Sequence, residues 1–248
     1  EVEGSGSDVA AGMMREAAKL GVKNLTARAS AIARKGEVLV VSTDTGELQA
    51  RSVVIATGAR LKTLGVPGEA EFEENGVSHC ADCDGPMFQN ETVAVIGGGD
   101  SALQEANVLT HYCGKVLLIH RGTAFRAQQR LIDQVNANDK IEKRFGTTVE
   151  AILGGQMVEK IRVKTAAGSE EIAAAGVFAY IGLEPNTAFV PDSIKRDDQG
   201  RLVTSDALET ALPGVWAIGA VRSACGGSLD DAIAEAHRAA DAVAARLK

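Results

Sequence analysis

The chain has 248 residues, of which 24% are charged and 45% hydrophobic, and its formal net charge is −7. This length and composition suit one large or two ordinary globular domains and exclude a disordered chain. An acidic chain without a block of Lys or Arg is a poor nucleic-acid binder, and no apolar run approaches the roughly 20 residues that span a bilayer. With no signal-peptide pattern either, we expect a cytoplasmic protein that binds neither nucleic acid nor a membrane.

The N-terminal part of the chain predicts one helix followed by β-strands. Ser7 or Asp8 can cap a helix that ends near Leu20. The runs of β-forming residues after it are 22–29, 37–42 and 47–56, and the last is followed by Thr57-Gly58-Ala59. A meander that leads into a buried strand and then a glycine-containing turn is not a βαβ unit.

The middle of the chain has a different pattern, typical of a parallel sheet. Val93–Ile96 is a short, wholly apolar strand, as expected for a strand covered on both faces. Glycines follow it, then a helix of about 101–112 and a second apolar strand at 115–120. The C-terminal part predicts an apolar strand at 214–218, closed by Gly219, and a helix at about 229–247 with capping-box spacing of Ser228 and Asp231.

The glycines after the first apolar strand form a dinucleotide-binding motif. Residues 97–102, Gly-Gly-Gly-Asp-Ser-Ala, match G-x-G-x-x-A between a strand and a helix, which is the context that the motif requires. Gly97 allows the tight turn, and Gly99 allows the backbone to approach a pyrophosphate bound at the helix N-terminus. The alternative is a plain strand-to-helix turn.

The end of the second apolar strand predicts the choice of nucleotide. At this point of a dinucleotide site, an acidic residue binds the ribose 2′-hydroxyl of NAD, or an arginine binds the 2′-phosphate of NADP. This chain has His120-Arg121, and Arg126 follows shortly after. Cationic side chains suit a 2′-phosphate, so we expect NADPH. The alternative is that these arginines are merely solvated.

Two of the four cysteines, Cys80 and Cys83, are spaced C-x-x-C, which lets two thiols form and break a disulfide with little backbone movement. A zinc site normally needs four ligands, and only His79 could join the pair locally. An inert structural disulfide is the other alternative. Asp84 could supply the proton that leaves and returns with each redox cycle, or could be a surface turn residue. We expect Cys113 to stay outside the bridge, and Cys225 to react as an ordinary exposed thiol.

Taken together, these motifs resemble one family. Residues 80–85, Cys-Ala-Asp-Cys-Asp-Gly, match the C-A-x-C-D-G signature of the low-molecular-weight thioredoxin reductases, which also occurs in the flavoprotein subunit of alkyl hydroperoxide reductase. The resemblance covers nearly the whole chain. The other segments that follow the family's order and spacing are 56–59, the Gly97 motif, His120-Arg121, 181–187 and 214–219.

The resemblance implies an α/β fold of two domains, in which an FAD domain is split by an inserted NADPH domain that carries the C-x-x-C pair. It places the FAD domain at 1–63 and 187–248 and the inserted domain at 64–186. In the family the inserted domain rotates, so that the disulfide and the nicotinamide alternate against the flavin. The expected protein is a homodimeric oxidoreductase that passes electrons from NADPH through FAD to Cys80–Cys83 and on to a thioredoxin-like protein.

The resemblance also assigns roles to single residues. Cys83 would face the flavin, Cys80 would attack the partner's disulfide, and Asp84 would be the acid and base. FAD would lie along Thr57, Gly58 and Gly219, and NADPH would be held by Gly97, Gly99, Ala102, Arg121 and Arg126. The further cofactor-binding residues that we expect are Ala59, Asp100, Ser101, His120, Ile181, Gly182 and Ala220, and no metal ligand is expected.

The chain departs from the family pattern in several places. No strand–turn–helix for the ADP half of FAD precedes Glu1, so the chain is interpreted as starting inside the FAD domain. Gly219-Ala220 stands where the family has Gly-Asp, residues 223–227 replace an Arg-Gln pair, and Gly122 replaces an arginine. The alternatives are a diverged nucleotide-binding chain without flavin or activity, and a reductase whose electron acceptor is a peroxiredoxin.

Overall fold

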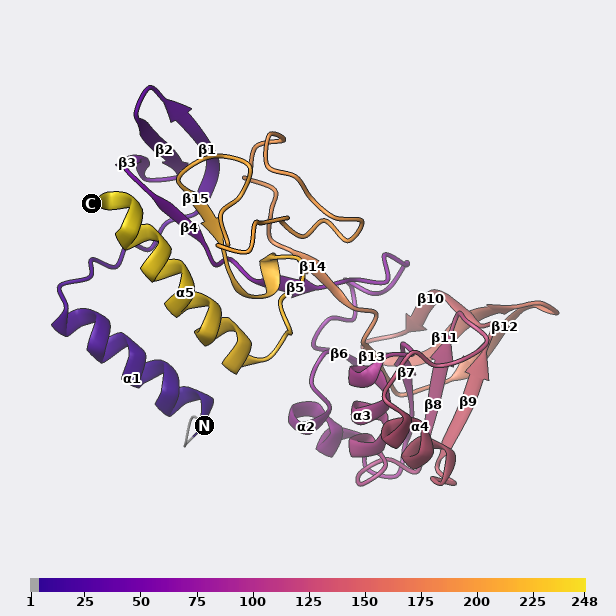
Figure 1. The fold of residues 1–248 in the computed structure, drawn as a ribbon. Helices are drawn as coiled ribbons and strands as arrows, with labels where there is room; N and C mark the ends of the chain where they lie inside the picture. Colours follow the sequence, from indigo (N-terminus) through magenta and orange to yellow (C-terminus); the bar gives the residue numbers. More distant parts are fainter. Residues whose placement is uncertain (1–4) are drawn as a thin grey trace. The chain divides into compact units, whose positions relative to one another are not determined.

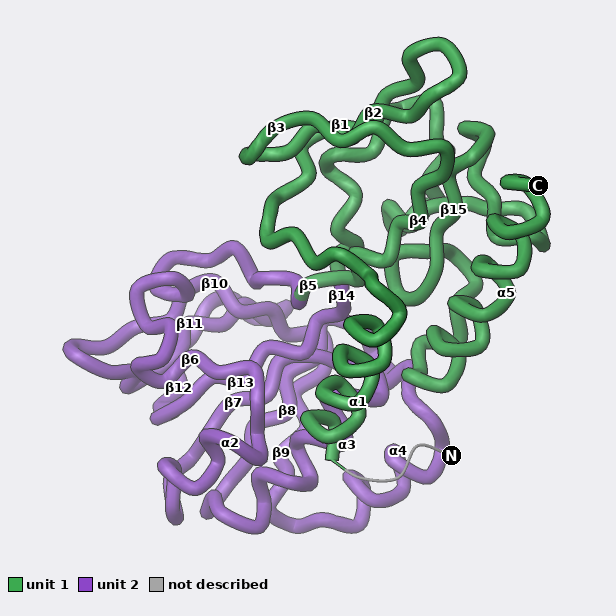
Figure 2. The backbone as a smooth tube through the Cα atoms, turned by 90° about the vertical axis from the view of Figure 1, so that its left-hand side faces the viewer, with its two compact units in different colours: residues 1–60, 184–248 green, residues 61–183 purple. Residues whose placement is uncertain are grey.

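The computed structural model describes residues 5–248, which divide into two compact units (Figure 2). One unit combines the residues up to 60 with residues 184–248, and the other consists of residues 61–183. These boundaries fall slightly before those expected from the sequence, and the interpretation of the units as flavin and nucleotide domains stays a prediction. The predicted α/β class is confirmed, because helices alternate with strands of a parallel sheet.

The unit of residues 61–183 is built on a five-stranded sheet in the order β6-β13-β7-β8-β9 (Figure 1). Every neighbouring pair in it is parallel. A second sheet of β10, β11 and β12 is antiparallel. The elements are β6 (Val77–Ser78), α2 (Ala81–Asp84), η1 (Gly85–Phe88), β7 (Thr92–Ile96), α3 (Asp100–Leu109), β8 (Lys115–His120), α4 (Gln129–Asn136), β9 (Ile141–Phe145), β10 (Thr148–Gly154), β11 (Val158–Thr165), β12 (Gly168–Ala173) and β13 (Gly176–Ala179).

The apolar strands β7 and β8 bury both of their faces. Val93 and Val95 pack on the side of the sheet covered by α3 and α4, and Ala94 and Ile96 pack on the side covered by the antiparallel sheet. Residues of β8 alternate in the same way. Because successive side chains of a strand point to opposite faces, a strand between two covering layers must be apolar throughout. The sequence prediction of a doubly covered parallel sheet is therefore confirmed.

The other unit holds a three-stranded antiparallel sheet, a short parallel pair of β4 with β15, and two helices. Its core gathers Ile32, Leu39, Ile55 and Val215 with residues of the 187–221 segment, and Trp216 packs against Ala239 of the last helix. The elements are α1 (Gly6–Lys19), β1 (Ala29–Lys35), β2 (Val38–Thr43), β3 (Gly46–Ala50), β4 (Val53–Ile55), β15 (Val215–Ala217), η2 (Gly219–Val221) and α5 (Leu229–Leu247). Two further strands, β5 (Ala59–Leu61) and β14 (Leu183–Pro185), pair with each other and each extend one residue beyond the bounds of this unit.

Two of the predicted strands differ from the structure. Residues 22–28 form no strand, and the first strand begins only at Ala29 because it pairs with β2 across a turn at Gly36, whose φ is 64°. The run 47–56 is broken between Ala50 and Val53, since β3 pairs with β2 whereas β4 pairs with β15. The prediction of one continuous strand was therefore wrong there.

The first and last helices, α1 and α5, both begin at a capping box. Ser5, and not Ser7 or Asp8, caps α1, and Asp8 supplies the acidic partner of that capping box. The last helix has the predicted bounds, and Ser228 with Asp231 forms its predicted capping box. Such reciprocal hydrogen bonds satisfy amide groups that a helix start otherwise leaves unpaired.

Replacing Leu118 by Ala should lower the free energy of unfolding of its unit by about 2–5 kcal/mol, because its side chain is fully buried in the centre of β8 and the change leaves a cavity. The matched control is Leu183→Ala, since Leu183 is 52% exposed and should change stability by no more than about 0.5 kcal/mol. Denaturant titration followed by circular dichroism measures both. Equal effects of the two variants would contradict the packing described for β8.

Candidate functional site

Four segments singled out by the sequence leave the parallel sheet at its carboxyl edge. His79 and Cys80 follow β6, Tyr180 follows β13, Gly97 follows β7, and Arg121 follows β8. Backbone bonds join these segments, since Tyr180 N–H donates to Ile96 O and Gly97 N–H donates to Ile119 O. In open α/β sheets this edge is where ligands bind. The fold therefore brings the predicted disulfide and the predicted nucleotide motif to one edge of one sheet.

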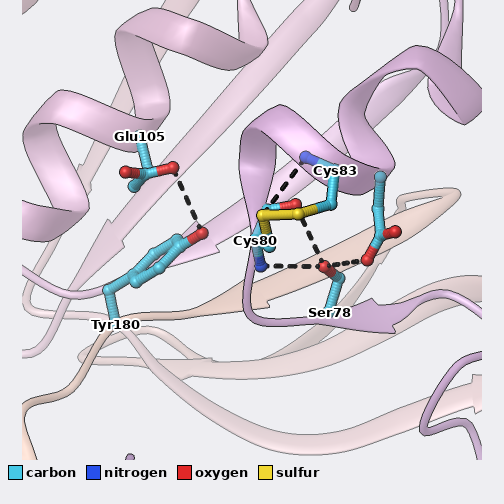
Figure 3. Close-up of a disulfide and its surroundings, with 6 residues drawn as sticks. Ser78, Cys80, Cys83, Glu105 and Tyr180 are labelled. Atoms are coloured by element: carbon cyan, nitrogen blue, oxygen red, sulfur yellow. Dashed lines mark hydrogen bonds between the residues drawn. A yellow bond between two sulfur atoms is a disulfide. The ribbon is translucent and has the colours of Figure 1, made fainter. Parts of the chain in front are cut away.

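Cys80 and Cys83 are joined in a disulfide with an S–S distance of 2.08 Å (Figure 3). Cys80 is half-buried and precedes the short helix α2, whereas Cys83 is exposed on that helix. The backbone N–H of Cys83 donates to Cys80 Sγ at 3.2 Å. Cys113 and Cys225 are free, so the predicted pairing is confirmed. Burial raises the pKa of the Cys113 thiol to about 11, although nearby Lys140 opposes this.

The Asp84 carboxylate accepts a hydrogen bond from a residue of the parallel sheet. The hydroxyl of Ser78, the last residue of β6, donates to Asp84 Oδ2 at 2.5 Å. The same hydroxyl oxygen accepts from the backbone N–H of Cys80 at 3.1 Å, as Figure 3 shows. The carboxyl predicted to exchange protons therefore lies one hydroxyl group away from the cysteine backbone.

A second carboxyl lies near the disulfide, on α3. Tyr180 donates to Glu105 Oε2 at 3.5 Å, and both residues are drawn beside the disulfide in Figure 3. Burial raises the pKa of Glu105, and the charge of Asp82 adds to this, while the backbone of Ala81 and the Tyr180 hydroxyl oppose it. Burial, followed by the charge of Glu105, also raises the pKa of Tyr180. Glu105 was not singled out from the sequence.

The glycine motif fits a dinucleotide. A Cβ at Gly97 would lie 2.3 Å from Tyr180 O and 2.7 Å from Ala102 Cβ, and one at Gly98 would lie 2.3 Å from His120 Nδ1. No heavy atom lies within 4 Å of the position where Gly99 would carry a Cβ. The first two glycines are thus required by packing, while the third leaves its backbone open to a ligand, as a pyrophosphate contact requires.

The residues around that motif hold the loop in place. Asp100, the first residue of α3, accepts from the backbone and side-chain N–H groups of Gln128 at 2.7 and 2.8 Å. Arg126 N–H donates to Gly98 O at 2.7 Å. Ser101 is exposed, and Ala102 is fully buried against Gly97. From the sequence, Asp100 was predicted to contact the cofactor. The structure shows in addition that Asp100 accepts hydrogen bonds from Gln128, a contact that depends on the tertiary fold.

The residues predicted to bind the 2′-phosphate, His120, Arg121 and Arg126, differ in their surroundings. Arg121 and Arg126 are exposed. His120 packs beside Phe125 and Phe145, and burial lowers its pKa, with the nearby Arg126 and Arg121 charges adding to this and the backbone of Ala124 opposing it. A neutral imidazole contributes no cationic charge. The positive charge at the end of β8 therefore comes from the two arginines.

The residues predicted to lie along FAD belong mostly to the other unit. Thr57 donates through its hydroxyl to Asn186 O at 2.9 Å, and Asn186 N–H donates to Gly58 O. Gly58 has φ 61°, and no heavy atom lies within 4 Å of the position of its absent Cβ. Ala59 begins β5, which pairs with β14. This backbone is open to a flat or phosphate-bearing ligand, which fits a flavin nucleotide.

Ile181 and Gly182 lie just before β14, in the segment by which the chain returns from the unit of residues 61–183. Ile181 is 36% exposed. Gly182 has φ 104° with open space around it, and its carbonyl accepts from Lys62 N–H at 3.0 Å.

The second predicted flavin segment, around Gly219, is organised by a buried ion pair. Gly219 has φ 71°, and its N–H donates to Glu235 Oε2 at 2.8 Å. Arg222 also binds Glu235, and these bonds lower the pKa of Glu235 although burial opposes them. Ala220 is exposed and carries no polar side-chain atom. Gly219 is buried and its N–H is bound to Glu235. A flavin here would therefore find no free Gly219 N–H and no side-chain carboxylate at Ala220, the residue where the resemblance places one.

The sequence profile named "Pyridine nucleotide-disulphide oxidoreductase" matches residues 4–242. The chain belongs to this family. Among its relatives, a thioredoxin reductase of Treponema pallidum is 38% identical over 221 residues, which is 88% of this chain and 72% of that protein. A thioredoxin reductase of Listeria innocua is 43% identical over 191 residues, which is 75% of this chain and 60% of that protein.

A solved structure also resembles this member of the family. The crystal structure of thioredoxin reductase from Lactococcus lactis superposes with a TM-score of 0.86 at 32% identity, covering 97% of this chain and 80% of that one. The resemblance to thioredoxin reductases that the C-A-x-C-D-G signature indicated is thus confirmed. As a member of this family, the chain is an oxidoreductase.

Residues 5–248 contain neither a helix that could span a membrane nor a cluster of metal-ligating side chains. None of the helices combines the length and apolar character needed to cross a membrane. Within the same residues, no three His, Cys, Asp or Glu side chains gather in a way that could hold a metal ion.

The raised pKa of Glu105 predicts how stability depends on pH. A carboxyl with a raised folded-state pKa contributes stability below its ordinary pKa of 4.5, and this contribution is lost as pH rises through the folded-state pKa. Glu105→Gln should therefore gain stability relative to the unchanged protein as pH rises from below 4.5 to neutral. Urea unfolding at both pH values measures this. Glu159→Gln, an exposed carboxyl on β11, is the control, and an equal gain there would contradict the assignment.

Proposed function

We propose that the chain reduces the disulfide of a thioredoxin with electrons from NADPH, using FAD and the Cys80–Cys83 pair. The observation that carries this proposal is the Cys80–Cys83 disulfide at the same sheet edge as the open glycine motif. Membership of the family and relatives that are themselves thioredoxin reductases support it. A cytoplasmic location and a homodimer are further parts of the proposal, and the homodimer rests on the resemblance alone.

On the nucleotide side, Gly97, Gly99 and Ala102 would bind the pyrophosphate, and Arg121 and Arg126 would bind the 2′-phosphate. Bound FAD, along Thr57, Gly58 and Gly219, would supply the two-electron relay between nicotinamide and disulfide. The chain's own contribution there is the open backbone at Gly58, a glycine in the left-handed conformation, which lets the cofactor approach closely.

On the thiol side, the reduced pair would attack the partner. The thiolate of Cys80 would attack one sulfur of the partner's disulfide, forming a mixed disulfide and releasing a partner thiolate. The thiolate of Cys83 would then attack Cys80, which restores the internal bridge and releases the second partner thiolate. The N–H that Cys83 donates to Cys80 Sγ favours the thiolate form of that sulfur. Asp84 would pass a proton from the cysteine pair to a departing partner thiolate. Over the whole reaction the two thiols of Cys80 and Cys83 are oxidised to a disulfide, and the partner's disulfide is reduced to two thiols.

Purified protein with bound flavin should oxidise one NADPH for each thioredoxin disulfide that it reduces, since each is a two-electron step. Cys83→Ser should abolish this coupled reaction, because the internal bridge cannot form again. Cys225→Ser, which changes a free thiol, is the matched control and should keep the activity. NADPH consumption and thiol release are followed in parallel. Activity that survives in Cys83→Ser, or no turnover in the unchanged protein, would refute the proposed function.

Arg121→Ala should reduce the preference for NADP over NAD by roughly 10- to 100-fold, because a charge-assisted hydrogen bond to the 2′-phosphate is lost. Calorimetric titration with both nucleotides measures the preference without depending on turnover. Arg162→Ala is the control, because Arg162 lies on β11 and pairs with Glu171. If Arg121→Ala weakens binding of both nucleotides equally, Arg121 does not read the phosphate.

A further inference from the structure

Ser78 lies two residues before the C-x-x-C pair and has no part in the electron route proposed above. Its side chain is buried, since the residue is only 5% exposed. Its backbone belongs to β6, where it pairs with Phe178 of β13. The hydroxyl is therefore fixed to the parallel sheet, whereas Asp84 lies at the end of the short helix that carries the cysteines.

Three polar groups lie within reach of the Ser78 hydroxyl. Asp84 Oδ2 is 2.5 Å from Oγ, the Cys80 backbone nitrogen is 3.1 Å away, and the Cys80 carbonyl oxygen is 3.4 Å away. A hydroxyl has one proton to donate and two lone pairs that accept. It can therefore donate to the carboxylate or to the carbonyl, but not fully to both, while the Cys80 N–H occupies one lone pair throughout.

These partners match both protonation states of Asp84. With Asp84 ionised, the Ser78 hydroxyl donates to the carboxylate, which is the arrangement with the short 2.5 Å distance. With Asp84 protonated, its O–H donates to the free lone pair of Ser78 Oγ, and the hydroxyl proton turns to the Cys80 carbonyl. In each state every donor has an acceptor, so neither form of Asp84 leaves a buried group unpaired.

We propose that Ser78 is a positioning residue that holds Asp84 in both of its protonation states by reversing the hydrogen bond between them. The proposal rests on the function proposed above, in which Asp84 passes a proton from the cysteine pair to the departing partner thiolate. Ser78 gains and loses no proton in that transfer, because only the direction of its hydrogen bond changes. Alanine at position 78 has no hydroxyl group, so it could form a hydrogen bond neither with the ionised nor with the protonated carboxyl of Asp84.

Other titratable groups surround α2, and the test must separate their effects from that of Ser78. His79 Nε2 lies 3.3 Å from Glu73 Oε1, and Tyr112 packs against Gly85. These groups, from the elements packed around α2, are His79, Glu73, Asp82, Glu105, Tyr112 and Tyr180.

The test is a double-mutant cycle on a reaction that needs no nucleotide. Pre-reduced protein is mixed with a small aliphatic disulfide, whose departing thiolate takes up a proton, and quenching with a thiol-alkylating reagent follows re-oxidation of Cys80 and Cys83 in a single turnover. Ser78→Ala should slow this step about tenfold, Ser78→Thr should restore it, and Ser78→Ala should have no further effect in an Asp84→Asn background. Ser169→Ala, which removes a hydroxyl bound to the Glu150 carboxylate at 2.7 Å, is the control and should leave the rate unchanged.

The outcomes separate this proposal from the proposed function. If Ser78→Ala slows the step equally with and without Asp84, or if it has no effect while Asp84→Asn does, Ser78 does not act through Asp84 and the proposal is overturned alone. If Asp84→Asn itself leaves the rate unchanged, the proton role in the proposed function fails as well. Thermal unfolding of each variant shows that the compared proteins are folded, and the cycle decides the result even if threonine does not fit.

Discussion

Parallel pairing of β13 with two strands at once organises this protein. Val177 pairs with Val77 of β6 on one side and with Ala94 of β7 on the other. Because all three strands run the same way, the segments that follow them leave the sheet at a common edge. Tyr180 is far in the sequence from both the cysteine pair and the glycine motif, and it lies beside their segments only because this ladder forms.

The strand that carries the cysteines is very short, so its position depends on its neighbours. β6 has only two residues, Val77 and Ser78, both buried. The segment before it is fastened by Glu69, whose carboxylate accepts from the backbone N–H groups of Leu64 and Gly65 at 2.7 Å each. Two carboxyls, one at the end of α2 and one on α3, then lie in different surroundings. Asp84 is bound by a hydroxyl from the sheet, and Glu105 is desolvated beside Tyr180. Such unequal environments are how a protein separates the roles of like groups.

The sequence predicted the parts of this fold in which one residue pattern has one structural solution. Wholly apolar runs such as Val93–Ile96 need cover on both faces, so this prediction holds. The glycine motif follows at the expected strand-to-helix turn, where Gly97 has no room for a side chain. Residues 22–28 contain β-forming side chains but no neighbouring strand pairs with them, and Val22 and Leu25 are left exposed. A strand exists only with a partner, which local composition does not reveal. Ser78, Glu105 and Gln128 were missed for a related reason, since their roles come from neighbours that only the tertiary fold supplies.

The disulfide encloses very little chain, and this separates chemistry from stability. Its cysteines are three positions apart, and in the chain-entropy account a bridge of that span is worth about 2 kcal/mol against about 4.7 kcal/mol for a loop of 100 residues. The sheet beneath, with β7 and β8 buried on both faces, does not rely on the bridge for its cohesion. Opening the bridge therefore releases a single turn of backbone and leaves the hydrophobic core intact. A protein built this way can be oxidised and reduced many times without approaching its unfolding transition, because the bond that opens when the cysteine pair takes up electrons is not one that holds the fold together.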